Sequence, residues 1–422
     1  MKVYKFGGAS VRNADGVRNL VKIIGGERDL FIVVSAMGKT TNALERVFAG
    51  VQKADAQACA EEIAALRAYH AGIVEELWHG AARLPRVDEL FARLERTVAE
   101  GGYRAEDAEA WYDRIVAFGE LISTTIISEY LACAGIPNRW IDMRRALVTE
   151  QRHKDAEVDL RASAPLLRAE VEGREERIFV GQGFIGGAPD GTTTTLGREG
   201  SDYSAAVVAH ILDAESMAVW KDVDGVLNAD PKIFPDAVQI AELNYLDTIE
   251  LAYSGAQIIH PRTIKPLQNK NIPLYVRPFG DKRKPGTVIR GVSAPVEVPI
   301  LILKKDQVLL TIRSRDFSFV LEEKFAAIFS LLERFRIKTN LIHNSAVNLS
   351  LCVDDSWHID QAVDALRREG FDVMKIGSME LLTVRGYTDE LWQRHACGPQ
   401  VFIRQATQST VRIVRKEVKG DN

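Results

Sequence analysis

Short, continuous apolar segments alternate with amphipathic helical patterns through roughly the first two thirds of the chain. These segments occupy residues 2–6, 30–36, 138–142, 177–182, 216–220 and 272–277. Strands that are apolar on both faces, with helices between them, are typical of a parallel sheet that helices cover on both sides. We therefore predict an α/β fold with a parallel-type sheet sandwiched between helices.

Two longer stretches of this region, residues 44–82 and 103–131, carry apolar residues at intervals of three and four. This spacing places the apolar side chains on one face of a helix. We predict that the two stretches form an all-helical insertion within the sandwich.

The pattern changes near residues 283–299, where Pro, Gly and Ser cluster as they do in linkers. The order beyond this point is strand 307–314, helix 321–335, strands 339–344 and 347–353, helix 358–369 and strand 379–386. This βαββαβ order is that of a ferredoxin-like unit. Two more strand patterns follow at 400–406 and 409–418, and we interpret the basic tail 411–420 as an edge strand.

Composition narrows the range of partners. The 422 residues contain 54 Lys and Arg against 58 Asp and Glu, a net charge of -4, which offers no general attraction for nucleic acid. The longest apolar runs are far shorter than the roughly 18 to 20 residues of a membrane span, and the N-terminus shows no secretory pattern. The four cysteines are far apart, so we expect reduced thiols, no metal site formed by protein ligands, and a cytoplasmic location without membrane attachment.

The segment KFGGAS, residues 5–10, ends a predicted strand with two glycines and a hydroxyl residue. Glycine lets the backbone approach a ligand closely, and N–H groups at the start of the next helix favour an anion. Lys5 would bring its ammonium group to the same edge of the sheet, where ligands of open α/β sheets bind. A tight turn without a ligand is the alternative interpretation.

A second polar loop, residues 191–200, delivers Arg198, Ser201 and Asp202 to the start of a helix rich in small residues. Ser201 and Asp202 suit a helix start without any ligand, but four consecutive threonines and two glycines exceed what capping requires. A third loop, residues 221–237, is rich in Asp yet lacks the terminal Glu of a calcium loop. A nucleotide-facing loop and a simple turn both remain open for it.

Glu120 lies in GELIST, residues 119–124, inside an otherwise apolar predicted helix. A buried carboxylate needs a cationic partner. The ammonium group of a ligand is one candidate, and Arg114 of the same chain is another.

Seven segments of the chain, in this order, closely resemble aspartate kinases, members of the amino acid kinase family with ACT regulatory modules. They read KFGGASV, VVSAMGKTTNAL, FGELIST, GQGFIGG, TTTLGREGSDYSAA, DVDGVLNADP and SGAQIIHPRTI. The resemblance spans about residues 2–353, most of the chain. It implies an amino acid kinase catalytic domain over residues 1–292, an ACT domain over 300–386 and an abbreviated second ACT-like segment over 387–422.

The resemblance implies transfer of the γ-phosphoryl group of ATP, with Mg2+, to the side-chain carboxylate of L-aspartate, giving 4-phospho-L-aspartate. This reaction is the first step towards lysine, threonine and methionine. The acceptor carboxylate is already ionised near neutral pH, so the site has mainly to position the reactants and stabilise charge. A homo-oligomer and a monofunctional enzyme, without a homoserine dehydrogenase region, are also implied.

By the same resemblance, Lys5 steadies the transferred phosphoryl group and Asp202 organises the transfer centre. Arg198 holds the α-carboxylate of aspartate through a bidentate fork, and Glu120 pairs with its α-ammonium group. The other substrate-pocket positions are Ser35, Thr41, Phe184 and Ser201. The nucleotide-side positions are Lys5, Gly7, Gly8, Ser10, Lys221, Asp222, Leu227, Lys232 and Gln257.

Some nucleotide-side residues depart from the pattern of the family. Glu199 stands where glycine is usual, Gln257 where many members carry a phosphate-contacting Lys, and Leu227 replaces a common Tyr beside the adenine. Because a carboxylate repels phosphates, we expect Glu199 to point outward or to pair with a neighbouring cation. Lys221, where the family often has Thr, is a candidate to compensate for Gln257.

The resemblance also implies an amino-acid effector, lysine or threonine, at Asn340, Asn344 and Ser345. Asn340 stands where lysine-sensitive relatives carry an Asp that recognises the ammonium group of the effector. A neutral amide cannot supply that ion pair, so weakened or absent feedback inhibition is the hypothesis.

Two other functions remain open from the sequence. One is another amino acid kinase, acting on acetylglutamate, glutamate, carbamate or uridylate. The other is a catalytically impaired amino-acid sensor, which Glu199 and Gln257 motivate. The chain retains the four principal site residues of the family, Lys5, Glu120, Arg198 and Asp202. An active aspartate kinase is therefore favoured.

Overall fold

The computed structural model describes residues 1–80, 83–256, 259–292, 296, 298–315, 322–387 and 400–417. The chain divides into two compact units. The first unit contains Met1–Val226, Ala241–Ile249 and Ile258–Ala294, and the second contains Leu227–Ile240, Glu250–Gln257 and Pro295–Asn422. Two segments that precede the predicted linker therefore belong to the second unit.

The first unit is built on an eight-stranded sheet with the order β10-β12-β11-β7-β1-β2-β4-β3. Its strands are β1 (Lys2–Phe6), β2 (Leu30–Val34), β3 (Arg139–Ile141), β4 (Ile178–Gln182), β7 (Ser216–Lys221), β10 (Glu242–Asn244), β11 (Leu274–Pro278) and β12 (Thr287–Arg290). Its paired strands run parallel except β11 with β12. β2 and β4 are buried along their whole length, which explains their continuous apolar sequences and confirms the α/β class.

The predicted strands of this region all correspond to observed ones, with ends that differ by at most about two residues. The prediction of a linker over residues 283–299 is wrong in part, because β12 lies inside it and pairs with β11. A strand of four residues beside Pro and Gly gives too short a pattern to be separated from a loop by sequence.

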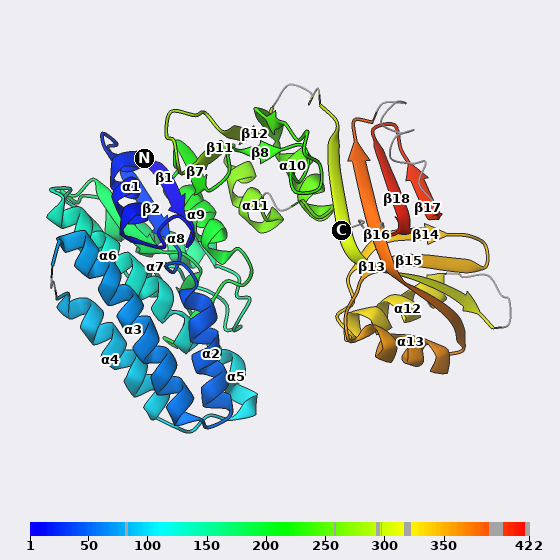
Figure 1. Cartoon of the computed structure of the whole chain (residues 1–422), viewed down its shortest axis with the longest axis horizontal. Helices are drawn as coiled ribbons and strands as arrows, with labels where there is room; N and C mark the ends of the chain where they lie inside the picture. Colours follow the sequence, from blue (N-terminus) through cyan, green and yellow to red (C-terminus); the bar gives the residue numbers. More distant parts are fainter. Residues whose placement is uncertain are drawn as a thin grey trace. The chain divides into compact units, whose positions relative to one another are not determined.

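The predicted helical insertion is confirmed. It consists of α2 (Thr40–Gln52), α3 (Ala56–Trp78), α4 (Pro85–Ala99), α5 (Ala108–Val116) and α6 (Phe118–Cys133). These helices, blue to cyan in Figure 1, pack against one another, and α4, which the sequence analysis omits, packs against α6. The remaining helices of the first unit are α1 (Ala14–Ile24), α7 (Met143–Ala146), α8 (Leu160–Val171), α9 (Gly200–Ile211) and α11 (Pro261–Asn269), while α10 (Tyr245–Tyr253) spans the division between the units.

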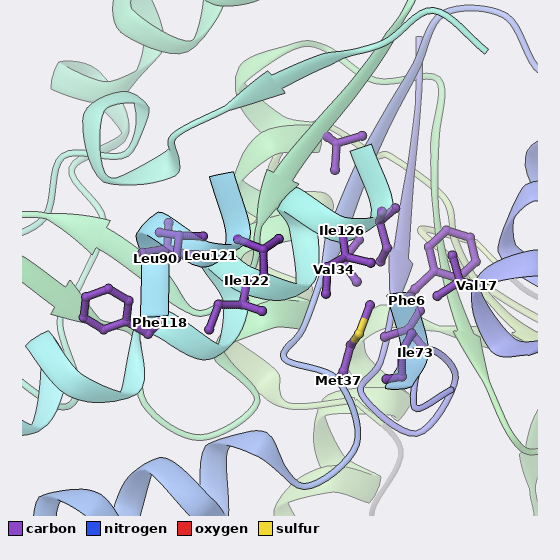
Figure 2. Close-up of a cluster of buried hydrophobic side chains, with 14 of the residues drawn as sticks. Phe6, Val17, Val34, Met37, Ile73, Leu90, Phe118, Leu121, Ile122 and Ile126 are labelled. Atoms are coloured by element: carbon purple, nitrogen blue, oxygen red, sulfur yellow. The ribbon is translucent and has the colours of Figure 1, made fainter. Parts of the chain in front are cut away.

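Helix α6 joins the insertion to the sheet. Figure 2 shows Ile122 and Ile126 of α6 in one cluster of buried side chains with Phe6 of β1 and Val34 of β2. The helical stretch Ala105–Cys133 is long and apolar enough to cross a membrane, but 83% of its apolar window is buried inside the protein. Such burial is typical of a core helix in a soluble protein, and it places Glu120 of α6 in the protein interior.

The second unit is built on a six-stranded antiparallel sheet with the order β14-β15-β13-β16-β18-β17. Its elements are β13 (Ile300–Ser314), α12 (Glu322–Arg334), β14 (Thr339–Asn344), β15 (Asn348–Asp354), α13 (Ile359–Arg368), β16 (Phe371–Arg385), β17 (Val401–Ala406) and β18 (Thr410–Lys416). The first six confirm the predicted βαββαβ order, drawn from yellow to orange in Figure 1.

Three predictions about these strands are corrected. β13 begins at Ile300 and β16 at Phe371, several residues before the predicted starts, and each continues through an irregularity in their pairing. The basic tail is not an edge strand, because β18 pairs with β16 on one side and with β17 on the other. Burial of alternate residues such as Val411 and Ile413 against this sheet produces the pattern that resembles an edge strand.

Free thiols are found at Cys59, Cys133 and Cys352, and Cys397 lies outside the described residues. Cys59 and Cys352 are buried, as expected of structural cysteines.

Glu380 of β16 is 2% exposed, and its Oε1 lies 2.6 Å from Nε of Arg415 on β18. We expect Glu380→Gln to lower the free energy of unfolding by about 1–3 kcal/mol, because a neutral amide removes the buried negative charge that lies against the guanidinium. Urea unfolding followed by circular dichroism measures this change. The exposed Glu369 serves as the control, and its Gln variant should keep the urea midpoint of the unsubstituted protein.

Candidate active site

Two lysines and an aspartate meet at the carboxyl ends of the central strands. Lys5 of β1 lies in register with Val33 of β2 and Val219 of β7. Its Nζ is 2.6 Å from Oδ1 of Asp202, which lies in the first turn of α9. Nζ of Lys221, the last residue of β7, is 3.9 Å from Oδ2 of the same carboxylate. Three residues assigned from separate sequence segments thus form one charged centre.

This centre is largely withdrawn from water. Lys5 is 9% exposed and Asp202 is 3% exposed. Burial acts to raise the pKa of Asp202, but the charges of Lys5 and Lys221 outweigh it and hold that pKa below its usual value. Asp202 is therefore ionised at neutral pH and keeps two ammonium groups at one point of the sheet edge, where they attract an anion.

The loop after β1 lies directly against the loop after β2. The N–H of Gly38 donates to the carbonyl of Gly8 at 3.0 Å, and a Cβ on Gly8 would lie 2.5 Å from the carbonyl oxygen of Ala36. A Cβ on Gly7 would lie 3.6 Å from Nζ of Lys5. Glycine at position 8 therefore permits a close backbone approach, and glycine at position 7 places no side chain against the ammonium group of Lys5.

A cleft of about 600 Å³ adjoins the charged centre within the first unit. Ser10, Lys221 and Asp222, all assigned from sequence to the nucleotide side, line it together with Arg12. Of the acidic residues that line the cleft, Asp222 is the one with no ion pair to a described residue. The hydroxyl of Ser10 donates to the carbonyl of Trp220 at 3.3 Å, which ties the first loop to the end of β7.

Glu120 of α6 is a buried carboxylate with one oxygen in use. Its Oε1 accepts a hydrogen bond from the N–H of Ala36 at 3.0 Å, whereas Oε2 is buried and accepts none from the described part of the chain. Arg114, the internal partner considered from sequence, pairs with Glu100 at 2.6 Å instead. Burial raises the pKa of Glu120 to about 8, against smaller opposing effects that include the charge of Lys5. Glu120 therefore has an oxygen available for a cationic ligand.

The start of α9 lies close to the loop that follows β4. A Cβ on Gly183 would lie 2.4 Å from Cβ of Ser201, so this loop requires glycine. Phe184, which follows, has a φ of 66° and donates its N–H to Oγ of Ser204 at 2.9 Å. Its carbonyl accepts from the N–H of Leu196 at 2.8 Å. Phe184 and Ser201, both assigned to the substrate pocket, are thus on adjoining backbone segments.

Glu199 adopts neither of the two orientations expected from sequence. It has a φ of 55°, in the region that favours glycine, which is a physical reason for the glycine usual there. Its Oε2 accepts from the N–H of His260 at 3.0 Å, directly before α11, so it does not point outward unpaired, and it pairs with no cation among the described residues. The preceding Arg198 is exposed and has no hydrogen bond or ion pair with any described residue.

The remaining site predictions are only partly located. Ser35 donates its N–H to the carbonyl of Phe6 at 3.1 Å, and Thr41 lies in the first turn of α2. Leu227 and Lys232 belong to the second unit, and Gln257 lies outside the described residues. Their assignment to the nucleotide stays a prediction.

The predicted effector residue Asn340 is buried in a polar cluster of the second unit. Its Nδ2 donates to Oε1 of Gln307 and to Oδ1 of Asp354, both at 2.7 Å. Its Oδ1 accepts from Nζ of Lys304 at 2.9 Å, and the same ammonium group lies 2.6 Å from Asp354. The amide of Asn340 is thus already engaged on both its oxygen and its nitrogen.

The other two predicted effector residues follow on the same hairpin. Asn344 is exposed at the end of β14, and the N–H of Ser345 donates to the carbonyl of Asn348 at 2.9 Å. Their role in effector binding stays a prediction.

Two residues that contact the loop before α9 are missed by the sequence analysis. Asp113 of α5 is fully buried and accepts hydrogen bonds from Thr195 at the start of that loop, and Arg262 of α11 donates to the carbonyl of Leu196. The sequence signal for Asp113 is weaker than that for Glu120, since Asp113 is a carboxylate within an amphipathic helix that carries other charges. Arg262 gives no such signal, because an arginine near a helix start is ordinary on a surface.

The geometry can bind an anion between Lys5 and Lys221, a cationic group at Glu120 and a larger anionic ligand in the cleft. The described residues contain no group of three or more His, Cys, Asp and Glu that could hold a metal ion. The lysines can contribute positioning and charge stabilisation to chemistry at this site.

Comparison with known proteins gives a consistent result. Residues 1–278 match the amino acid kinase family. The chain is 32% identical over 357 residues to the lysine-sensitive aspartokinase 3 of Escherichia coli strain K12, covering 83% of this chain and 78% of that protein. It is similar in structure to the E. coli aspartokinase III in complex with aspartate and ADP, with 27% identity, a TM-score of 0.80 and coverage of 99% of this chain and 96% of the other. The structure of the same enzyme in complex with lysine and aspartate gives the same identity, TM-score and coverage.

Burial of Glu120 should make stability depend on pH. Its pKa is near 4.5 in the unfolded chain and about 8 in the folded protein. Between these values the unfolded chain releases a proton that the folded protein keeps, so the free energy of unfolding falls as pH rises, by up to about 1.4 kcal/mol per pH unit. We expect Glu120→Gln, which cannot ionise, to gain stability relative to the unsubstituted protein across this interval and to gain no more above it.

Urea unfolding at pH values below, between and above these two pKa values checks the expectation. Glu129→Gln on the same helix is the matched control, because Glu129 is partly exposed and pairs with Arg86. Parallel stability curves for the Glu120 variant and the unsubstituted protein would contradict the raised pKa.

Proposed function

We propose that this chain, which belongs to the amino acid kinase family, is an aspartate kinase that converts ATP and L-aspartate to ADP and 4-phospho-L-aspartate. The observation that carries the proposal is the available buried oxygen of Glu120, close enough to Lys5 for the lysine charge to act on its pKa. Aspartate would place its ammonium group at Glu120 and its side-chain carboxylate towards the lysines. The related E. coli enzyme binds aspartate and ADP.

The reaction needs no general base, because the acceptor carboxylate is ionised at neutral pH. A carboxylate oxygen of aspartate forms a bond to the γ-phosphorus while the bond from that phosphorus to the β–γ bridging oxygen breaks, and ADP leaves. The ammonium groups of Lys5 and Lys221 stabilise the charge of the transferred group, and their limited exposure strengthens this effect. Asp202 does not react in this scheme, but it holds Lys5 in position.

We propose that ATP enters with Mg2+ and occupies the cleft beside the lysines. The volume of about 600 Å³ lies within the range of pockets for ligands of this size. When bound, Mg2+ neutralises part of the phosphate charge. Asp222 would face the metal, since it is the acidic residue of the cleft without an ion pair among the described residues. Lys221 would supply a cationic contact that Gln257 cannot.

Selection of aspartate would depend on two opposite charges. Arg198, exposed and without a partner among the described residues, would hold the α-carboxylate. Glu120 would pair with the α-ammonium group. Acceptors without an ammonium group would leave the buried carboxyl group of Glu120 without its ion-pair partner, which is a basis for rejecting them. This favours aspartate over acetylglutamate, carbamate or uridylate within the family.

We further propose that residues 300–386 act as an ACT domain with residues 387–422 as a partial second one. The βαββαβ order and the two additional strands support this assignment. A cytoplasmic location and a homo-oligomer are proposed from the resemblance to aspartate kinases.

An assay of aspartyl phosphate formation tests the activity. With Mg-ATP, L-aspartate and hydroxylamine, the protein should release ADP and form aspartyl hydroxamate. Lys5→Met and Asp202→Asn should each lower kcat by about 100-fold or more, because each removes or misplaces charge at the transfer centre. Lys2→Met is the matched control, since Lys2 lies at the opposite end of β1 and pairs with Glu27, and it should keep kcat within about twofold.

The same assay separates the alternatives. Aspartate that raises the thermal unfolding midpoint without forming hydroxamate would indicate an amino-acid sensor. ADP release that depends on acetylglutamate, glutamate, carbamate or uridylate instead of aspartate would indicate another kinase of the family.

We expect neither lysine nor threonine to inhibit this activity strongly. The ammonium group of Lys304 already contacts Asn340 and Asp354, so the predicted effector position is satisfied by the chain itself. Initial rates measured with each amino acid at increasing concentration check this. Strong inhibition by either one would sink the hypothesis of weakened feedback.

A further inference from the structure

We propose that Asp113 and Arg262 are positioning residues that fix the loop carrying Arg198 and thereby set the affinity for aspartate. The loop comprises residues 195–199, from the last residue of β6 (Thr193–Thr195) to the residue before α9, and is called the substrate loop below. This inference rests on the proposed function, in which Arg198 holds the α-carboxylate of aspartate.

Asp113 holds the start of the substrate loop from the helical insertion. Its side chain is 0% exposed. Oδ2 accepts from the N–H of Thr195 at 3.0 Å, and Oδ1 accepts from the Thr195 hydroxyl at 2.5 Å. Nδ1 of His153 and the N–H of Lys154 lie 2.8 and 3.1 Å from Oδ2. Asp113 therefore joins α5, residues 153–154 and the end of β6 through hydrogen bonds that all reach one carboxylate.

These bonds suit a carboxylate, which accepts at both of its oxygens. The N–H groups of Thr195 and Lys154 can only donate, and an ionised carboxylate offers acceptor sites to both of them and to the Thr195 hydroxyl. Burial raises the pKa of Asp113, and the hydrogen bonds from Thr195, Lys154 and His153 oppose that rise. An amide of the same size offers one acceptor oxygen in place of two and carries no charge, so Asp113→Asn weakens the cluster without changing its volume.

Arg262 holds the next residue of the substrate loop from α11. Its Nη1 donates to the carbonyl of Leu196 at 3.1 Å and to Oδ1 of Asp155 at 2.6 Å. Its Nη2 donates to the carbonyl of Ala156 at 2.9 Å, and its guanidinium lies over the ring of Tyr203 on α9, 4.7 Å from the centroid. The planar guanidinium thus joins three backbone segments, which a lysine cannot reproduce.

The substrate loop has little room to move between these contacts. Gly197 has a φ of 74°, and a Cβ there would lie 2.5 Å from Oδ1 of Asp155. At the far end, Glu199 accepts the N–H of His260 at 3.0 Å. The unusual Glu199 is therefore a third anchor of the loop, directed to α11.

Arg198 itself has no hydrogen bond or ion pair with any described residue. Its guanidinium is thus placed only by the backbone on either side, which the anchors at Thr195, Leu196 and Glu199 fix. A shift of this backbone would misplace a group that contacts aspartate and leave the lysine centre at β1 and β7 intact. Loss of an anchor should therefore raise KM for aspartate far more than KM for ATP.

Steady-state kinetics of three variants test this. Asp113→Asn and Arg262→Lys should each raise KM for aspartate by about 10- to 100-fold and keep KM for ATP within about twofold. Thr195→Val removes one hydroxyl contact to Asp113 and should give a smaller rise of the same kind. The double variant Asp113→Asn, Thr195→Val should raise KM for aspartate little more than Asp113→Asn alone does, because both changes break the same contact.

Glu380→Gln is the matched control for burial. It neutralises an equally buried carboxylate in the second unit, so it should lower stability and leave both KM values unchanged. The shift of the thermal unfolding midpoint with aspartate alone, without ATP, gives a second readout, and it should shrink in the loop variants but not in the control.

The outcomes separate this inference from the proposed function. A raised KM for aspartate in the loop variants, with the control unchanged, supports it. An active unsubstituted protein whose loop variants lose stability but keep the KM for aspartate would overturn the inference alone. If Asp113→Asn does not fold, the KM for aspartate of Thr195→Val and of Arg262→Lys decides between these outcomes. An unsubstituted protein that forms no aspartyl hydroxamate would overturn the proposed function and this inference together.

Discussion

The buried ion pair between Lys5 and Asp202 is the constraint on which the rest of the site depends. Two charges can be withdrawn from water at tolerable cost only when they lie close together, and here the two residues come from β1 and α9, far apart in the sequence. The parallel sheet brings the carboxyl end of β1 beside that of β7, and Gly183 lets the start of α9 approach the loop after β4. Lys221 then joins the pair from β7, which leaves a surplus of positive charge at the sheet edge.

Glu120 presents the opposite electrostatic problem. The helical insertion buries this carboxylate with one oxygen unsatisfied, which costs stability at neutral pH and raises its pKa to about 8. A ligand ammonium group would offset that cost. The site is therefore preorganised for a cationic group before the ligand binds. Binding of the α-ammonium group of aspartate would explain why Glu120 is buried here, since a helix that is apolar all round has no structural need for a carboxylate.

Two substitutions that looked damaging in the sequence are accommodated locally. Glu199 could repel a phosphate, but the turn that starts α9 directs its carboxylate to the N–H of His260, where the dipole of α11 favours negative charge. Asn340 lacks the charge expected of an effector site, but Lys304 and Asp354 surround its amide. In both places the partner comes from a distant part of the chain, which is why neither outcome could be read from the neighbouring residues.

The sequence by itself determined the α/β class, six of the eight strands of the central sheet, the helical insertion and the βαββαβ order, and it singled out Lys5, Glu120 and Asp202 as candidate site residues. These follow from local patterns, because periodicity, glycine position and an isolated charge in an apolar helix are visible within a few residues. Only the tertiary structure decided that Arg114 pairs away from Glu120, that β18 is an internal strand, and that Asp113 and Arg262 meet at the loop of Arg198. Those outcomes depend on which distant segments become neighbours, and the free energy of a buried charge is set by these neighbours and not by its place in the sequence.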